Sequence, residues 1–438
     1  MKAKIALFSL SGLLAVCGLL PAPAQSLAPD PKATVSSSQT AAPPKSFWDQ
    51  DYMLGDWGGT RSRLEDEGVK FDFNDIGDFL TDVTGDQSHH ATYFGRFRAG
   101  VDLDLNKLTG NDAEFYATAI YQYGRNLSGD YLHTNTLTSS IAGIESLRMD
   151  QFWYKQWLFD HKFAFTIGQI ATVNYFGATD FFDILFNDEL GYAPNALFST
   201  RQPFSPAGKP GVMFWQDLSA ITPGLYTQAG VFVGSDNFYR PDSNGVYYED
   251  DFNHGITEAV EVGYKEQNTV YDGVYKLGAN GAEEHFTDLA TGQPVRNDYN
   301  IYAIVEKTVF RPMGTDGKID TKKGLDMLFE FVGEPGDRNP LQYEFTMGGR
   351  YTGLIPGRPT DKVGFGLIYS DNSDSASAAS QLAGGSSLVG ETTLEADYQY
   401  NPAPWLSIQP DVQYIIDPSG IQTRDNIVVL GLRTIVRF

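Results

Sequence analysis

Residues 426–438 alternate apolar and polar side chains in the manner of a β-strand. The even positions from Val428 to Phe438 are apolar or Thr, whereas the opposite face carries Arg433 and Arg437. A period of two predicts a strand with two unlike faces. Apolar groups on one side and arginines on the other suit a wall between lipid and water. A single strand of this kind also fits a soluble sheet, so the other segments of the chain are needed to distinguish a soluble sheet from a membrane barrel.

The same alternation recurs along the chain, around residues 96–105 and 341–351 and again in 391–401 and 406–417. On the last two segments the polar face carries Glu391, Thr393, Glu395, Asp397, Gln399, Ser407, Gln409, Asp411, Gln413 and Asp417. Because the polar faces mix both charge signs, a soluble sandwich fits less well than a barrel around a polar lumen. We therefore expect arginine to be costly at Leu394 or Val412 and close to neutral at Thr393 or Gln413.

Strand-like runs recur along most of the chain. We count about sixteen, near positions 70, 92, 113, 147, 162, 210, 225, 257, 271, 298, 324, 341, 362, 391, 405 and 426. Short connections at 160–161, 356–360 and 401–404 contrast with long ones at 126–146, 171–208, 236–255, 281–297 and 372–390. The predicted fold is all-β: a transmembrane antiparallel barrel of about sixteen strands with a short N-terminal periplasmic helical segment, Thr60–Glu67.

Composition and the N-terminus agree with an envelope protein. The chain has 438 residues, 13% of them aromatic, with 45 Gly. Lys2 and Lys4 precede an apolar run that ends before Ala22-Pro23-Ala24, the form of a cleaved signal peptide. We expect a signal peptide (1–24), a flexible periplasmic leader (25–46), and a barrel domain (47–438) in the outer membrane of a Gram-negative-type bacterium. The net charge of −23 argues against nucleic acid as a partner.

Three segments carry a more specific resemblance. Leu54 to Val69 (LGDWGGTRSRLEDEGV) and Trp405 to Pro418 (WLSIQPDVQYIIDP) resemble the N-terminal motif and the penultimate strand of OprB-type carbohydrate-selective porins. Phe163 to Gln169, followed by Phe176, resembles the centre of that family. The resemblance implies a sixteen-stranded outer-membrane porin that passes glucose and other sugars by passive diffusion. Departures such as the Ser/Ala/Gly-rich segment 370–390 leave the preferred sugar open.

A path for sugars needs charged or amide side chains beside aromatic rings in a narrowed lumen. Parity places such candidates on the polar faces of two neighbouring runs: Arg96, Arg98, Asp102, Glu114 and Gln122. Arginine is well suited, since its planar fork is fixed and always charged. The alternative is a structural ladder of opposite charges across the lumen, and both roles can hold together.

The connection 171–208 is the longest and mixes aromatic and acidic residues. Its candidates for a lumen constriction are Phe176, Asp180, Phe181, Asp183 and Tyr192. A loop of this length with so many rings is expected to be packed rather than loose. We expect it to fold into the lumen and narrow it, with an external cap as the alternative.

Other functions leave weaker traces. An outer-membrane barrel enzyme needs a nucleophile and a base in reach, and no recognisable arrangement of the histidines supplies them. We expect no enzyme, no cofactor and no metal site; a general diffusion porin without sugar preference remains an alternative. The expected partners are carbohydrate solutes, outer-membrane lipid, and the barrel assembly machinery through the terminal Phe438. A monomer and a trimer both remain open.

Overall fold

The structure is a computed structural model that describes residues 46–85, 89–179, 181, 184–190, 194–248, 254–314 and 316–438, without the side chains of 194–196 and 236–237. The expected signal peptide and nearly all of the leader lie outside these residues. Residues 45–438 form one compact unit. In this unit sixteen antiparallel strands close into a barrel, each pairing with its neighbours in the sequence and β1 with β16. The predicted barrel is confirmed.

The strands are β1 (Val69–Asp82), β2 (Ala91–Asp104), β3 (Ala113–Gly124), β4 (Leu147–Leu158), β5 (Phe163–Ile170), β6 (Lys209–Asp217), β7 (Leu225–Val233), β8 (Ile256–Lys265), β9 (Gly273–Thr287), β10 (Pro294–Phe310), β11 (Gly324–Gly333), β12 (Leu341–Thr352), β13 (Lys362–Asn372), β14 (Glu391–Ala403), β15 (Leu406–Ile416) and β16 (Ile427–Arg437). The helices are α1 (Thr60–Glu67), α2 (Leu105–Thr109), α3 (Pro194–Ser199) and α4 (Asp374–Leu382). Among the described residues no helix is long and apolar enough to cross a membrane. All sixteen predicted runs correspond to strands, and α1 has the predicted bounds.

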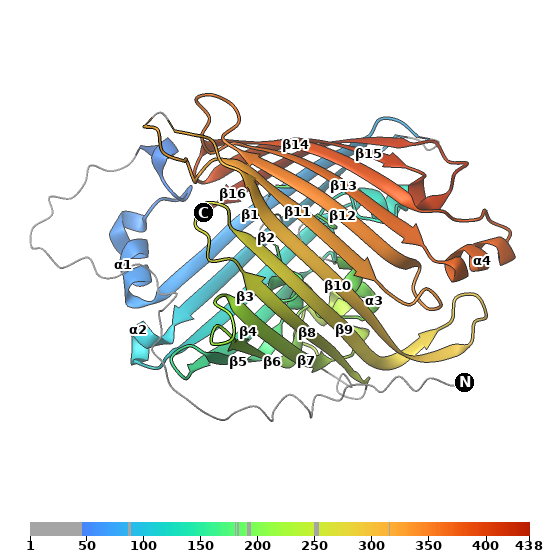
Figure 1. Ribbon diagram of the computed structural model, residues 1–438, viewed down its shortest axis with the longest axis horizontal. Coiled ribbons are helices and arrows are strands. Elements are labelled where there is room, and N and C mark those ends of the chain that lie inside the picture. The colour runs from blue at the N-terminus through green and yellow to red at the C-terminus, as the bar shows by residue number, and fades with distance from the viewer. Residues whose placement is uncertain are drawn as a thin grey trace, which may run out of the picture. The chain divides into compact units, whose positions relative to one another are not determined.

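The two ends of the barrel differ. Figure 1 shows α1, α2 and the C-terminus at one end, and α4 at the other. One predicted long connection is wrong: β9 and β10 pair as far as Thr287 and Pro294, so residues 281–297 form mostly strand. Polar residues there suggested a loop, but the ladder supplies the backbone partners that keep the segment extended.

The outer face is apolar, as the alternation predicts. Leu394 and Val412 are 39% and 40% exposed, and Leu430 and Leu432 lie beside them on the same face. Since lipid replaces water around such a wall, these side chains need no polar partner. The parity prediction is confirmed for these strands.

The inner face is polar but buried. Gln413 has no exposed surface, and its amide nitrogen donates to the Thr138 carbonyl at 2.9 Å, because a loop packs against it inside the barrel. Thr393 is also buried, at 1% exposure. The expectation that arginine is nearly neutral at these two positions is therefore wrong, since that expectation assumed a water-filled lumen.

The helical segment before β1 fixes the closing strand. Arg61 of α1 is 2% exposed; its Nη1 donates to the Phe438 oxygen at 2.6 Å, and its Nη2 donates to the Phe71 carbonyl at 3.0 Å. Its guanidinium lies 5.0 Å from the Trp57 ring centre. One arginine thus joins the first strand to the last residue.

We predict that Val412→Arg destabilises the folded barrel by about 2 to 4 kcal/mol, because the charge would face hydrocarbon from the middle of β15. The measurement is reversible urea unfolding in lipid bilayers. The control is Leu354→Arg, at an exposed turn residue (51%) beyond β12, where the expected cost is about 0 to 1 kcal/mol. Equal costs at the two sites would contradict the assigned orientation.

Candidate functional site

The connection between β5 and β6, residues 171–208, packs against the inner wall of the barrel through its described residues 176–177, 181 and 184–190, and we call it the constriction loop. Soon after β5 ends at Ile170, Phe176 is 1% exposed and packs with Met213, Phe232 and Ala259 from the inner faces of β6 to β8. The Gly177 N–H donates to Glu261 of β8 at 2.9 Å. The loop therefore starts against the wall rather than above it.

The loop then follows the inner wall around the lumen. Phe181 packs with Tyr302, Ile304, Leu328 and Val332 of β10 and β11. Further along, the residues in wall contact are Ile184, Leu185 and Leu190, which cluster with Ile368 of β13. This course covers the inner face of a large part of the barrel with apolar loop side chains.

Glycines on β13 make room for the loop. A Cβ atom built on Gly366 would lie 2.4 Å from the Leu190 Cδ1 atom, and one on Gly364 would lie 3.1 Å from the Ile184 Cγ1 atom. Atoms at such distances overlap, so a side chain at Gly366 would displace the loop.

Hydrogen bonds attach the loop backbone to β14 and β15. The Phe186 and Asn187 N–H groups donate to the two carboxylate oxygens of Glu395. Gln409 donates to the Ile184 carbonyl, and Arg433 of β16 donates to the Leu185 carbonyl at 3.3 Å. These wall side chains therefore satisfy the backbone of a loop that has left the sheet, as buried peptide groups require.

A second connection, residues 125–146, also enters the barrel. Its Leu127 and Leu132 pack with Phe186 and with wall residues of β1, β15 and β16. The Leu137 N–H donates to Asp188 of the constriction loop at 2.8 Å. The two inserted segments therefore support each other.

Of the predicted constriction residues, Phe176 and Phe181 are both 1% exposed and face the wall, not open space. The other three, Asp180, Asp183 and Tyr192, lie outside the described residues. Phe176 and Phe181 thus act as anchors of the loop, and the role of the loop in solute passage stays a prediction.

The five predicted lumen residues line the inner faces of β2 and β3. Arg96 lies opposite Gln122, and both are buried; the Gln122 amide donates to the Ile141 carbonyl of the second inserted segment at 2.6 Å. Arg98 is half-buried, Asp102 is exposed, and Glu114 is half-buried. Arg96 and Gln122 are therefore covered by loop residues. The other three, Arg98, Asp102 and Glu114, retain contact with open space.

The neighbouring strand β4 adds residues that the sequence analysis did not single out. Lys155 lies 3.7 Å from Glu114, and Trp157 donates to Glu114 at 3.2 Å. The rings of Trp153 and Tyr116 lie 5.3 Å apart on neighbouring strands. The alternation in 147–158 contained this signal, but aromatic residues on both faces obscured which ones point inward.

Several side-chain donors on β2 to β4 have no acceptor within the described residues, and two of them belong to Arg98 and Trp153. The buried Arg98 Nε and Trp153 Nε1 atoms form no hydrogen bond within the described residues. Arg433, by contrast, donates to both carboxylate oxygens of Asp78 at 2.7 Å. Arg98 and Trp153 are only half-buried as residues. A guanidinium beside an aromatic face at the edge of open space can bind a hydroxylated solute.

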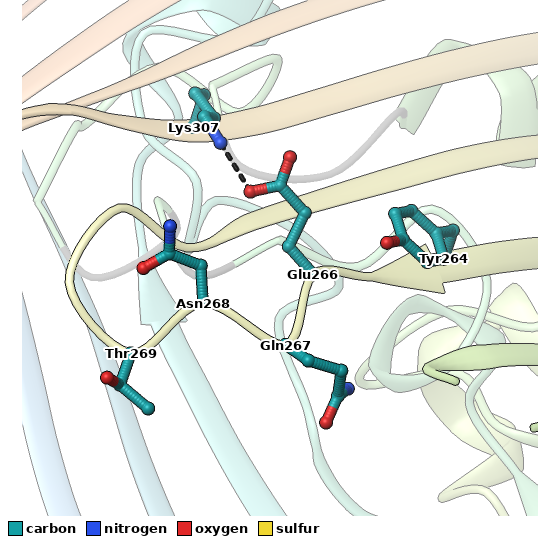
Figure 2. A pocket seen from close by; sticks show the side chains of 6 residues that line it. All are labelled: Tyr264, Glu266, Gln267, Asn268, Thr269 and Lys307. Carbon is teal, nitrogen blue, oxygen red and sulfur yellow. Dashed lines mark hydrogen bonds and ion pairs between the residues drawn. The ribbon is translucent and has the colours of Figure 1, made fainter. Parts of the chain in front are cut away.

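An open depression lies elsewhere, at the turn from β8 to β9. Figure 2 shows its lining of Tyr264, Glu266, Gln267, Asn268, Thr269 and Lys307, with an ion pair between Lys307 and Glu266. The side chains of Tyr264 and Lys307 belong to the alternating positions that face outward on β8 and β10. This depression therefore lies on the outside of the barrel and not in the lumen.

The sequence profile of the carbohydrate-selective porins of the OprB family matches residues 88–438. This chain belongs to that family. It is 27% identical to the porin QuiX of Acinetobacter baylyi over 93% of this chain and 97% of that one. It is 24% identical to Porin B of Pseudomonas aeruginosa over 89% of this chain and 91% of that one.

A solved structure has the same fold. The high-pH structure of Pseudomonas putida OprB aligns with a TM-score of 0.82 at 22% identity, over 90% of this chain and all of that chain (100%). The family and the fold are those of channel proteins. The chain is thus a carbohydrate-selective porin of the Gram-negative outer membrane, and the resemblance of its motifs is confirmed.

The inserted loop of this porin carries a buried acid. Burial, followed by the charges of Glu344 and Asp188, raises the pKa of Glu189 well above its usual value of 4.5. A carboxyl group whose pKa is higher in the folded state stabilises the fold at low pH, and this contribution is lost as pH rises above the unfolded value.

We therefore predict that Glu189→Gln reduces the loss of stability between pH 5 and pH 8, since the amide stays neutral throughout. Urea unfolding of the refolded porin at both pH values measures it. At pH 5 the variant and the parent should be similar. An unchanged pH dependence would show that Glu189 is not held neutral in the folded barrel.

Proposed function

We propose that this porin passes hexoses such as glucose by passive diffusion along the inner wall of β2, β3 and β4, where Arg98 and Trp153 bind the sugar. The observation that carries the proposal is the half-buried guanidinium of Arg98 on the same inner wall as the half-buried Trp153, whose ring lies beside that of Tyr116. A guanidinium group donates to sugar hydroxyls, and an indole face covers the weakly apolar side of the ring.

The remaining residues of this wall would complete the site. Asp102 and Glu114 accept hydrogen bonds from hydroxyl groups, and Asp102 is exposed. Tyr116 extends the aromatic surface beside Trp153. Arg96 and Gln122 are more buried and would support the path from behind rather than touch solute.

We propose in addition that the constriction loop directs solute toward this wall. The loop packs against inner-face residues of β8, β10, β11 and β13 to β16, where Glu261, Tyr302 and Gln409 are each 1% exposed or less. A solute in the lumen would then meet β2 to β4. Asp180, Asp183 and Tyr192 remain candidates for the rim of the constriction.

Weak binding is expected to be part of the mechanism. Passage needs an affinity strong enough to enrich the sugar and weak enough to release it. A dissociation constant of about 1 mM, equal to about −4 kcal/mol, meets both conditions. A general diffusion porin without preference would instead show no saturable sugar block.

We predict that Arg98→Ala lowers the affinity of sugar block by about tenfold, because one charge-assisted hydrogen bond contributes about 1.5 kcal/mol. Glucose-dependent current noise in planar bilayers measures it. Arg358→Ala, which removes an arginine paired with Asp361 at a turn, should leave sugar block unchanged. Trp153→Phe keeps an aromatic ring, although a smaller one, removes the N–H donor, and should weaken block less than Trp153→Ala.

If glucose blocks the current through the Arg98→Ala variant as strongly as through the parent, Arg98 belongs to a structural ladder of charges. If neither protein shows sugar block while both conduct, the general-porin alternative is favoured.

We also propose that the barrel assembly machinery recognises the terminal Phe438. In the folded barrel its N–H donates to the Phe73 carbonyl at 2.9 Å, and its oxygen accepts from Arg61. The residue thus has a place in the closed seam, and recognition would precede closure.

We predict that deleting Phe438 lowers the yield of heat-modifiable porin in the outer membrane, whereas Arg61→Ala lowers only its unfolding midpoint. Arg63→Ala, an exposed neighbour on α1, is the control for the helix. Gel shift of membrane fractions and urea unfolding separate the two effects. A normal outer-membrane yield without Phe438 would exclude the recognition role.

A further inference from the structure

Three carboxylates gather on the inner wall beside the middle of the constriction loop, where Phe186 and Asn187 bind one of them. Glu395 and Asp397 lie on β14, and Asp411 lies on β15 directly opposite Asp397. One oxygen from each lies within 4.8 Å of the other two, and the three residues are 4%, 6% and 6% exposed. Three negative groups so close together and so far from water need compensation.

Within the described residues the charge of Arg433, which lies opposite Gln409 on the neighbouring strand, acts on all three carboxylates. The same guanidinium is also paired with Asp78. Its donors go to Asp78, the Leu185 carbonyl and the Ser140 hydroxyl, and none goes to the three carboxylates. One guanidinium shared with Asp78 leaves more acidic than basic groups at the cluster.

Several oxygens at the cluster lack a donor. These include Asp397 Oδ1 and Asp411 Oδ1, which form no hydrogen bond. A further oxygen without a donor, outside the three carboxylates, belongs to the amide of Gln413, which is fully buried. Its Nε2 donates to Asp411 Oδ2 at 3.2 Å, while its Oε1 has no hydrogen-bond partner. A buried amide oxygen with no donor, beside carboxylates in the same condition, indicates a missing positive ligand.

We propose that Glu395, Asp397 and Asp411, with the Gln413 amide oxygen, bind a calcium ion in the wall of the porin. Calcium takes oxygen ligands at about 2.3 to 2.6 Å, so oxygens that lie within 4.8 Å of one another can reach a single ion. Its flexible coordination tolerates carboxylate and amide oxygens from two strands. This site is separate from the sugar path on β2 to β4.

The ion would also hold the constriction loop in place. Glu395 accepts the N–H groups of Phe186 and Asn187, and its oxygens retain lone pairs for a metal. Without the ion, repulsion among the three carboxylates would push Glu395 from its position. Chelation should therefore loosen the loop and raise the conductance.

The test uses full-length mature porin refolded in detergent without lipopolysaccharide, which binds calcium itself. After gel filtration, elemental analysis should find about one calcium per chain. Calorimetric titration should show calcium affinity at least about tenfold weaker in Asp397→Asn and in Asp411→Asn. Glu266→Gln, the same chemical change at an exterior turn, should retain the parent affinity.

A loss of affinity in these variants would also result from misfolding, so a further variant is designed to gain affinity. Gln413→Glu adds a fourth carboxylate at the same place and should bind calcium more tightly than the parent. The proposal is overturned if the parent porin binds no calcium, or if folded Asp397→Asn and Gln413→Glu both bind like the parent. These results are independent of sugar block and leave the proposed sugar path untouched.

Discussion

The structure depends on the closure of the sheet, because a strand in hydrocarbon has no water to satisfy its peptide groups. The ring closes where β1 pairs with β16. At that junction Arg433 holds Asp78 with two hydrogen bonds of 2.7 Å, and Arg61 reaches the last residue from α1. The seam is therefore fixed at two levels, within the lumen and at the end of the barrel.

Closure also divides the side chains into two environments. Outward residues need only be apolar, but inward ones need partners, and the inserted segments supply many of them. Glu395, Gln409 and Gln413 all bind backbone groups of these segments rather than water. The polar side chains on the wall near β14 to β16 thus hold the inserted segments in place. The wall of β2 to β4 retains donors without acceptors, which is why solute binding is expected there.

The period-two pattern predicted the strands and their orientation because each residue reports its own environment, lipid or lumen. It did not predict burial at Gln413, since a loop distant in sequence covers that position. Trp153 was missed because aromatic residues occupy both faces of β4. Glu395, Asp397 and Asp411 were each assigned to the polar face, but their proximity arises from the register of β14 and β15, which the alternation does not specify.

The way in which the constriction loop is held bears on how selectivity can vary. Several of its polar contacts with the wall use its backbone: the N–H groups of Gly177, Phe186 and Asn187 and the carbonyls of Ile184 and Leu185. Every residue type except proline offers both groups. Side chains of the loop that face the lumen can therefore change without loss of these contacts. A porin built in this way can alter the chemistry of its constriction while the wall that positions the loop stays the same.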